Sequence, residues 1–179
     1  MATYTHSPTK RFFEHLPPNG DLELTLLKCH LLVEEVLIAL IASRFLKPDR
    51  LDLGTTPFST KAMLARAAFP GEDDPWIWGA VNLLNKARVS LAHGLQVDKT
   101  ANLMNKFIEH VESAQHYPLG NPEGPGFGRF HWAAFEVFNH LVIVGGVAEP
   151  TRNLNRLAAA LLAYPPLDAS KLPYVAPAP

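Results

Sequence analysis

Apolar side chains recur every three or four residues along most of the chain, which is the period of an α-helix rather than of a β-strand. The longest such run covers about residues 22–46, opens after Asn19-Gly20-Asp21 and stops before Pro48. Its apolar positions surround most of the helix circumference, whereas a surface helix has one apolar face. We therefore expect this helix at the centre of a helical bundle.

The next helices are marked by their end signals. Ser59 is predicted to cap a short helix that ends at Phe69, with Phe58 and Met63 spaced as a hydrophobic staple. An acidic residue followed by Pro75 predicts the start of a third helix, which runs to about residue 93. Further helices are predicted over residues 98–117, 129–148 and 151–164.

No segment keeps the two-residue alternation of a strand, so the predicted fold class is all-α, a bundle of about five to six helices. We interpret residues 1–20 as an N-terminal arm and residues 21–164 as one helical domain. Residues 165–179 are rich in proline, which cannot continue a helix, and we expect them to form a flexible tail.

Charge and cysteine content limit the classes of function. Lys and Arg number 16 against 17 Asp and Glu, so a general nucleic-acid coat, which would be basic, is disfavoured, and any contact with nucleic acid must be local. Cys29 is the only cysteine, which excludes an internal disulfide and a thiolate metal cluster.

The first 20 residues do not resemble a signal peptide, and the most apolar stretch, residues 135–147, is too short to span a membrane. A cytoplasmic protein is the expectation.

The candidate chemistry lies at the end of the third helix, where Arg88 is followed five residues later by His93. A guanidinium binds phosphate through several donors, and histidine is the side chain that ordinarily titrates near neutral pH. The pair could therefore hold a phosphodiester and transfer a proton without a metal. Residues five apart in a helix point about 140° from one another. For the Arg88 and His93 side chains to meet, either the helix must unwind at Gly94 or two copies of the helix must cross in a homodimer.

A structural interpretation of the same residues stays open. Arg88 interrupts an apolar stripe, where an unpaired charge is costly, so it could form a salt bridge with Glu34 or Glu35. His93 would then only interact with the negative end of its helix.

Other polar clusters carry weaker signals. Glu136 and His140 are four residues apart, with His131 preceding them, but they lack a known metal-ligand spacing, so core or surface histidines are favoured. The glycine-rich segment 120–129 could receive a phosphate but lacks a P-loop ending, and a connector is favoured, with Arg129 a distant candidate for an RNA contact. No metal or cofactor is predicted.

Three segments in order resemble the HEPN family, closest to its branch of mannitol-operon repressor-like proteins. They are residues 27–37, residues 58–67, and the run Leu83-Leu84-Asn85-Lys86-Ala87-Arg88 with Leu91-Ala92-His93, which resembles the family's Arg-x4–6-His helix. Together they span about residues 22–97, roughly half the chain.

The resemblance implies a helical, dimeric domain that acts as a metal-independent endoribonuclease, as a toxin or phage-defence effector with an antitoxin protein as partner. Arg88 would bind the phosphate, and His93 would act as general acid or base during cleavage to a 2′,3′-cyclic phosphate. Asn85, Lys86 and Ser90 are the candidate substrate-binding residues. In active members a polar residue follows the arginine, whereas Val89 stands here. The alternative is therefore a non-catalytic regulatory or interaction module.

Overall fold

The computed structural model describes residues 8–16, 21–69, 75–93, 97–115 and 128–146. Within these ranges the chain forms six α-helices and one short 3-10 helix, with no strand, which confirms the predicted all-α class. The helices are α1 (Pro8–His15), α2 (Leu22–Arg44), α3 (Phe58–Ala68), α4 (Pro75–Ala92), α5 (Val97–Gln115) and α6 (Arg129–Ile143), and the 3-10 helix is η1 (Pro48–Arg50). The predicted helix 151–164 and the tail 165–179 lie outside the described residues.

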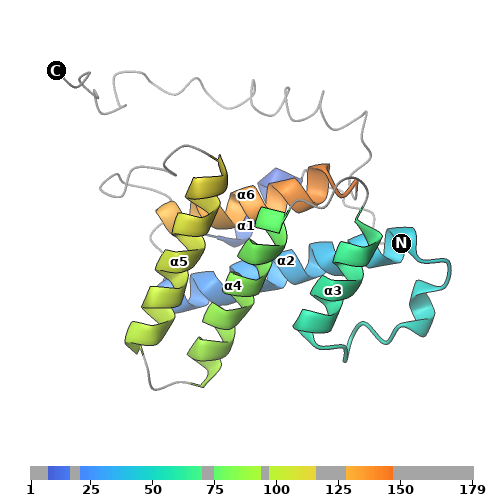
Figure 1. Cartoon of the computed structure of the whole chain (residues 1–179), viewed down its shortest axis with the longest axis horizontal. Coiled ribbons are helices and arrows are strands. Elements are labelled where there is room, and N and C mark those ends of the chain that lie inside the picture. Colours follow the sequence, from blue (N-terminus) through green and yellow to red (C-terminus); the bar gives the residue numbers. More distant parts are fainter. Residues whose placement is uncertain (1–7, 17–20, 70–74, 94–96, 116–127, 147–179) are drawn as a thin grey trace.

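The helices form two layers (Figure 1). In the view of Figure 1, α3, α4 and α5 run side by side in front, and α2 and α6 cross behind them with α1. α2 contacts α3, α4 and α6, so it occupies the central position that its apolar sequence predicted. None of the described helices combines the length and hydropathy that a membrane crossing requires.

The start of α2 follows from its capping residue. The Asp21 carboxylate accepts a hydrogen bond of 2.8 Å from the backbone N–H of Glu23, which satisfies one of the free donors of the first turn. The helix then runs to Arg44, and Pro48 opens the 3-10 helix that follows. Its largest fully buried side chains include Leu26, Leu37, Leu40 and Ile41.

The capping interpretation of the short helix α3 is wrong. α3 begins at Phe58, after an N-cap at Pro57 that makes no side-chain hydrogen bond, so Ser59 lies inside the helix. Met63 is 64% exposed and Phe58 packs against His30, 4.1 Å between ring centroids. The contact across the core, not a local staple, therefore fixes Phe58.

The fifth predicted helix ends earlier than its apolar pattern suggested. α6 stops at Ile143, and residues 144–146 form a turn in which Gly146 has a φ of 64°. This left-handed conformation is strained for other residues but accessible to glycine, so it ends the helix.

Helix α1 was not foreseen within the predicted N-terminal arm. Phe12 and Leu16 are fully buried, and the Phe12 ring contacts Phe135 and Phe138 of α6 at centroid distances of 5.4 and 5.1 Å. Only eight residues form this helix, too few to be stable alone, so packing on α6 must hold it in place.

Candidate functional site

Arg88 lies where α4 leaves the hydrophobic core. Ile77, Val81 and Leu84 of the predicted stripe are buried, but the next buried position is Ala87, and Arg88 is exposed. Arg88 forms no hydrogen bond or ion pair with any residue that the structure describes. The structural interpretation of Arg88 as the partner of Glu34 or Glu35 is therefore wrong, and Glu34 pairs with Lys61 instead.

His93 follows the last residue of α4 and is also exposed. Its backbone N–H donates to the carbonyl of Val89 at 3.1 Å, so the final turn stays helical up to this residue. The unwinding that would turn His93 toward Arg88 therefore does not occur before this point. In a regular helix the two side chains are offset by about 140° and by about 7.5 Å along the axis. Within one chain they lie at opposite edges of the exposed face of α4.

A buried polar network lies on the Arg88 side of α4. The His30 imidazole of α2 is 5% exposed, and its Nε2 lies 3.3 Å from the side-chain oxygen of Asn85 on α4. An amide oxygen can only accept, so Nε2 carries the proton in this hydrogen bond. The Phe58 ring covers one face of the imidazole. Asn85, a predicted substrate-binding residue, is therefore anchored to α2 by its oxygen.

The network continues from α2 to α3. Lys61 of α3 is only 3% exposed, and its Nζ donates a hydrogen bond of 2.6 Å to Oε1 of Glu34. The other carboxylate oxygen of Glu34 lies 4.0 Å from Nδ1 of His30. A buried ammonium needs such a charged acceptor, because desolvating an isolated charge is very unfavourable.

Electrostatics place Arg88 beside this network. Burial lowers the pKa of His30, while the hydrogen bond to Asn85 and the charge of Glu34 oppose that shift; the positive charges of Arg88 and Lys61 lower the pKa further. The imidazole is therefore neutral at pH 7. The exposed Arg88 thus acts by its charge on a buried neutral ring, which lies between α2, α3 and α4.

The other edge of α4 faces α5. The Ser90 and Thr100 hydroxyls form a hydrogen bond of 3.0 Å, so Ser90, another predicted substrate-binding residue, is engaged between the two helices. Lys86 and His93 are exposed and lie within about 60° of Ser90 around the helix axis. They therefore belong to the α5 side of the exposed face.

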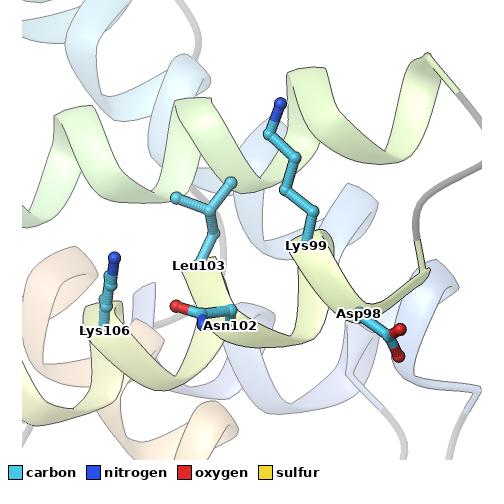
Figure 2. Close-up of a pocket in the computed structure, with 5 residues that line it drawn as sticks. All are labelled: Asp98, Lys99, Asn102, Leu103 and Lys106. Carbon is cyan, nitrogen blue, oxygen red and sulfur yellow. The ribbon is translucent and has the colours of Figure 1, made fainter.

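A shallow open hollow lies along α5, lined by Asp98, Lys99, Asn102, Leu103 and Lys106. In Figure 2, Lys99, Leu103 and Lys106 extend to the side on which α4 lies, whereas Asp98 points the opposite way. Two lysines seven residues apart thus border an apolar floor. None of these five residues was among the predicted site residues.

The predicted site residues are thus divided between two edges of α4. Asn85 and Arg88 lie beside α2, whereas Lys86, Ser90 and His93 lie toward α5. His30 and Lys61, which lie in the polar network beside Asn85, were not among the predicted site residues. The signal that could have found them is a polar residue at a position where the helical repeat of apolar residues predicts a core side chain.

The weaker candidates have structural roles. His131 is buried, and the His140 ring packs against Phe69 and Trp76, so core histidines are the better interpretation. Arg129 binds Glu112 through two hydrogen bonds, one of 2.9 Å from its Nε, and its guanidinium is therefore occupied. In the described part of the chain, no group of three or more His, Cys, Asp or Glu side chains could hold a metal ion.

Comparison with known protein families, with curated proteins and with solved structures gives no match. The resemblance to the HEPN family therefore rests on the three sequence segments alone.

Proposed function

We propose that the chain is a metal-independent endoribonuclease whose site forms between the α4 helices of two copies. The observation that supports this is the state of Arg88. It is an exposed guanidinium that no described carboxylate binds, at a place where the fold otherwise pairs its buried charges. A cation left open in this way is suited to an external anion, and a phosphodiester is one of the anions that arginine binds with several donors.

Two copies are required because one chain keeps Arg88 and His93 at opposite edges of α4. A two-fold axis near the exposed face of this helix would bring Arg88 of one copy toward His93 of the partner subunit, and the reverse pair would form by symmetry. Val89, 38% exposed, lies between the two edges and would be covered by such an interface.

The proposed reaction uses the RNA's own 2′-hydroxyl as nucleophile. Its oxygen attacks the adjacent phosphorus, a bond from that oxygen to phosphorus forms, and the bond from phosphorus to the 5′-oxygen breaks. His93 is the general base that accepts the proton of the 2′-hydroxyl, or the general acid that protonates the leaving 5′-oxygen, and water carries the other proton. Arg88 stabilises the negative charge that develops on the non-bridging oxygens. The products are a 2′,3′-cyclic phosphate and a 5′-hydroxyl end.

The test is RNA cleavage by the purified protein in the presence of EDTA. Arg88→Ala and His93→Ala should each abolish cleavage while leaving the helical circular dichroism spectrum and the melting temperature unchanged, because both side chains are exposed. If both variants cleave like the wild type, the assignment is wrong.

Mixing the two inactive variants tests the shared site. In a mixed dimer of Arg88→Ala and His93→Ala, one of the two sites combines an intact arginine with an intact histidine. Random exchange makes half of the dimers mixed, so about a quarter of the wild-type activity should return. A site built within one chain would give no recovery.

The second candidate is a non-catalytic interaction module, favoured by exposed apolar side chains rather than by charge. Leu24, Leu27 and Leu31 form a stripe on α2 and are 48%, 38% and 58% exposed, and Val89 is apolar where active relatives in the resembled family carry a polar residue. Growth on overexpression separates the two. A ribonuclease should arrest growth and His93→Ala should relieve the arrest, whereas an interaction module should show neither effect.

A further inference from the structure

Asn85 stands three residues before Arg88, so the two side chains are neighbours on one face of α4, with about 5–6 Å between their Cβ atoms. Asn85 is half-buried, and its oxygen is turned inward to the buried Nε2 of His30. The oxygen and nitrogen of an amide diverge from the same carbon, so with the oxygen on Nε2 of His30 the NH2 group points in another direction. That NH2 group donates no hydrogen bond to any residue in the described ranges.

From this arrangement we propose that Asn85 and Arg88 form a two-donor site for one phosphate group, and that His30 is the positioning residue that aims the Asn85 amide. The proposal rests on the proposed function in one respect, that the phosphate is a phosphodiester of RNA. Asn85 supplies neutral N–H donors and Arg88 supplies charged ones, a combination that matches the several acceptor oxygens of a phosphate.

An asparagine without this anchor could present either its oxygen or its NH2 group, and the oxygen would repel an anion. The His30 hydrogen bond removes that choice, because its Nε2–H requires an acceptor. A second contact holds the imidazole itself. The Phe58 ring packs against it at a tilt, with 4.1 Å between the ring centroids.

The charge of a bound phosphate should also reach His30. Among the described residues, four polar groups act on the imidazole: Glu34 from α2, Lys61 from α3, and Asn85 and Arg88 from α4. Arg88 lowers the pKa of His30, so an anion that neutralises Arg88 should raise that pKa. By linkage, protonation of His30 should strengthen anion binding by the same factor.

The experiment measures binding of a short, fluorescently labelled RNA in which every 2′-hydroxyl is methylated, so that it cannot be cleaved. Asn85→Ala should weaken binding about three- to tenfold, the usual effect of losing one hydrogen bond, and Arg88→Ala should weaken it more. Asn105→Ala, at an exposed asparagine of α5, is the matched control and should bind like the wild type.

The positioning role of His30 is tested by non-additivity. His30→Leu should weaken binding as much as Asn85→Ala, and the double variant should be no weaker than Asn85→Ala alone, because His30 acts only through Asn85. His30→Gln, whose amide can still donate near the position of Nε2, should restore binding and covers the case in which His30→Leu fails to fold. The NMR titration of His30 should shift to higher pH when the oligonucleotide is added.

Each result has a defined meaning. The inference is overturned if Asn85→Ala binds like Asn105→Ala, or if the losses of His30→Leu and Asn85→Ala add together. Inorganic phosphate, titrated in parallel, distinguishes a site for free phosphate from a site for RNA. If the protein binds phosphate but not the oligonucleotide, and Asn85→Ala weakens the binding of phosphate, the two-donor site is real but its use for RNA is overturned. Cleavage that requires Arg88 and His93 but ignores Asn85 would leave the proposed function intact and remove this inference.

Discussion

The buried ion pair between Lys61 and Glu34 predicts an unequal response to the loss of either partner. Lys61 is 3% exposed, whereas the Glu34 side chain keeps 22% of its surface in contact with solvent. Substituting each by Met removes one charge and leaves a side chain of similar length. The group left behind decides the outcome: Glu34→Met leaves a buried ammonium, and Lys61→Met leaves a partly hydrated carboxylate.

The magnitudes follow from this difference. Breaking a buried pair costs about 3–5 kcal/mol, and we expect Glu34→Met near the lower end, at about 3 kcal/mol. Lys61→Met should cost only about 1–2 kcal/mol, because the Glu34 side chain is 22% exposed and water can solvate the remaining carboxylate. The double variant leaves no stranded charge, and its loss should be about 0–1.5 kcal/mol, smaller than that of Glu34→Met alone.

The assay is urea unfolding followed by circular dichroism at pH 7.5, with the slope of each transition compared across the four proteins. Equal slopes are the control, since they show that the variants differ in stability and not in the compactness of either state. The reasoning is refuted if Lys61→Met is destabilised more than Glu34→Met, or if the double variant loses the sum of the two single losses.

Two further predictions concern stability. Burial holds the pKa of His30 in the folded protein below the value near 6.5 that the unfolded chain would show. As the pH falls through 6.5, the unfolded chain therefore takes up a proton on His30 before the folded protein does. The free energy of unfolding should decrease as a result. His30→Gln should flatten that decrease in urea titrations between pH 7.5 and 5; an unchanged pH dependence would show that other groups cause it. Phe12→Ala should cost about 3 kcal/mol because the ring is fully buried against α6, whereas Glu14→Ala on the exposed side of α1 should change stability by less than about 0.5 kcal/mol. Similar melting curves for these two variants would mean that α1 does not contribute to the folded core.

The candidate site could be predicted only in part. The sequence pointed to Arg88, His93 and Asn85, because a charged or polar residue at the end of an amphipathic helix is visible in a single segment. It did not predict that Glu34 would bind Lys61 instead of Arg88, a choice that depends on how α3 packs against α2. Nor did it assign a role to His30, whose partner is 55 residues away in the chain.

The amino-acid sequence alone determined the helical class, the central position of α2 and the approximate helix boundaries, because periodicity, caps and prolines act within a few residues of one another. Tertiary packing decided the rest. It recruited α1 to α6 and ended α6 at a glycine turn. It also sorted the polar residues of α4 into an anchored edge beside α2 and an open edge toward α5. These outcomes depend on contacts between segments that are distant in the sequence. A buried charge or hydrogen-bond donor needs a partner, because leaving it unpaired costs too much free energy. A local sequence pattern does not show which partner the fold will bring near.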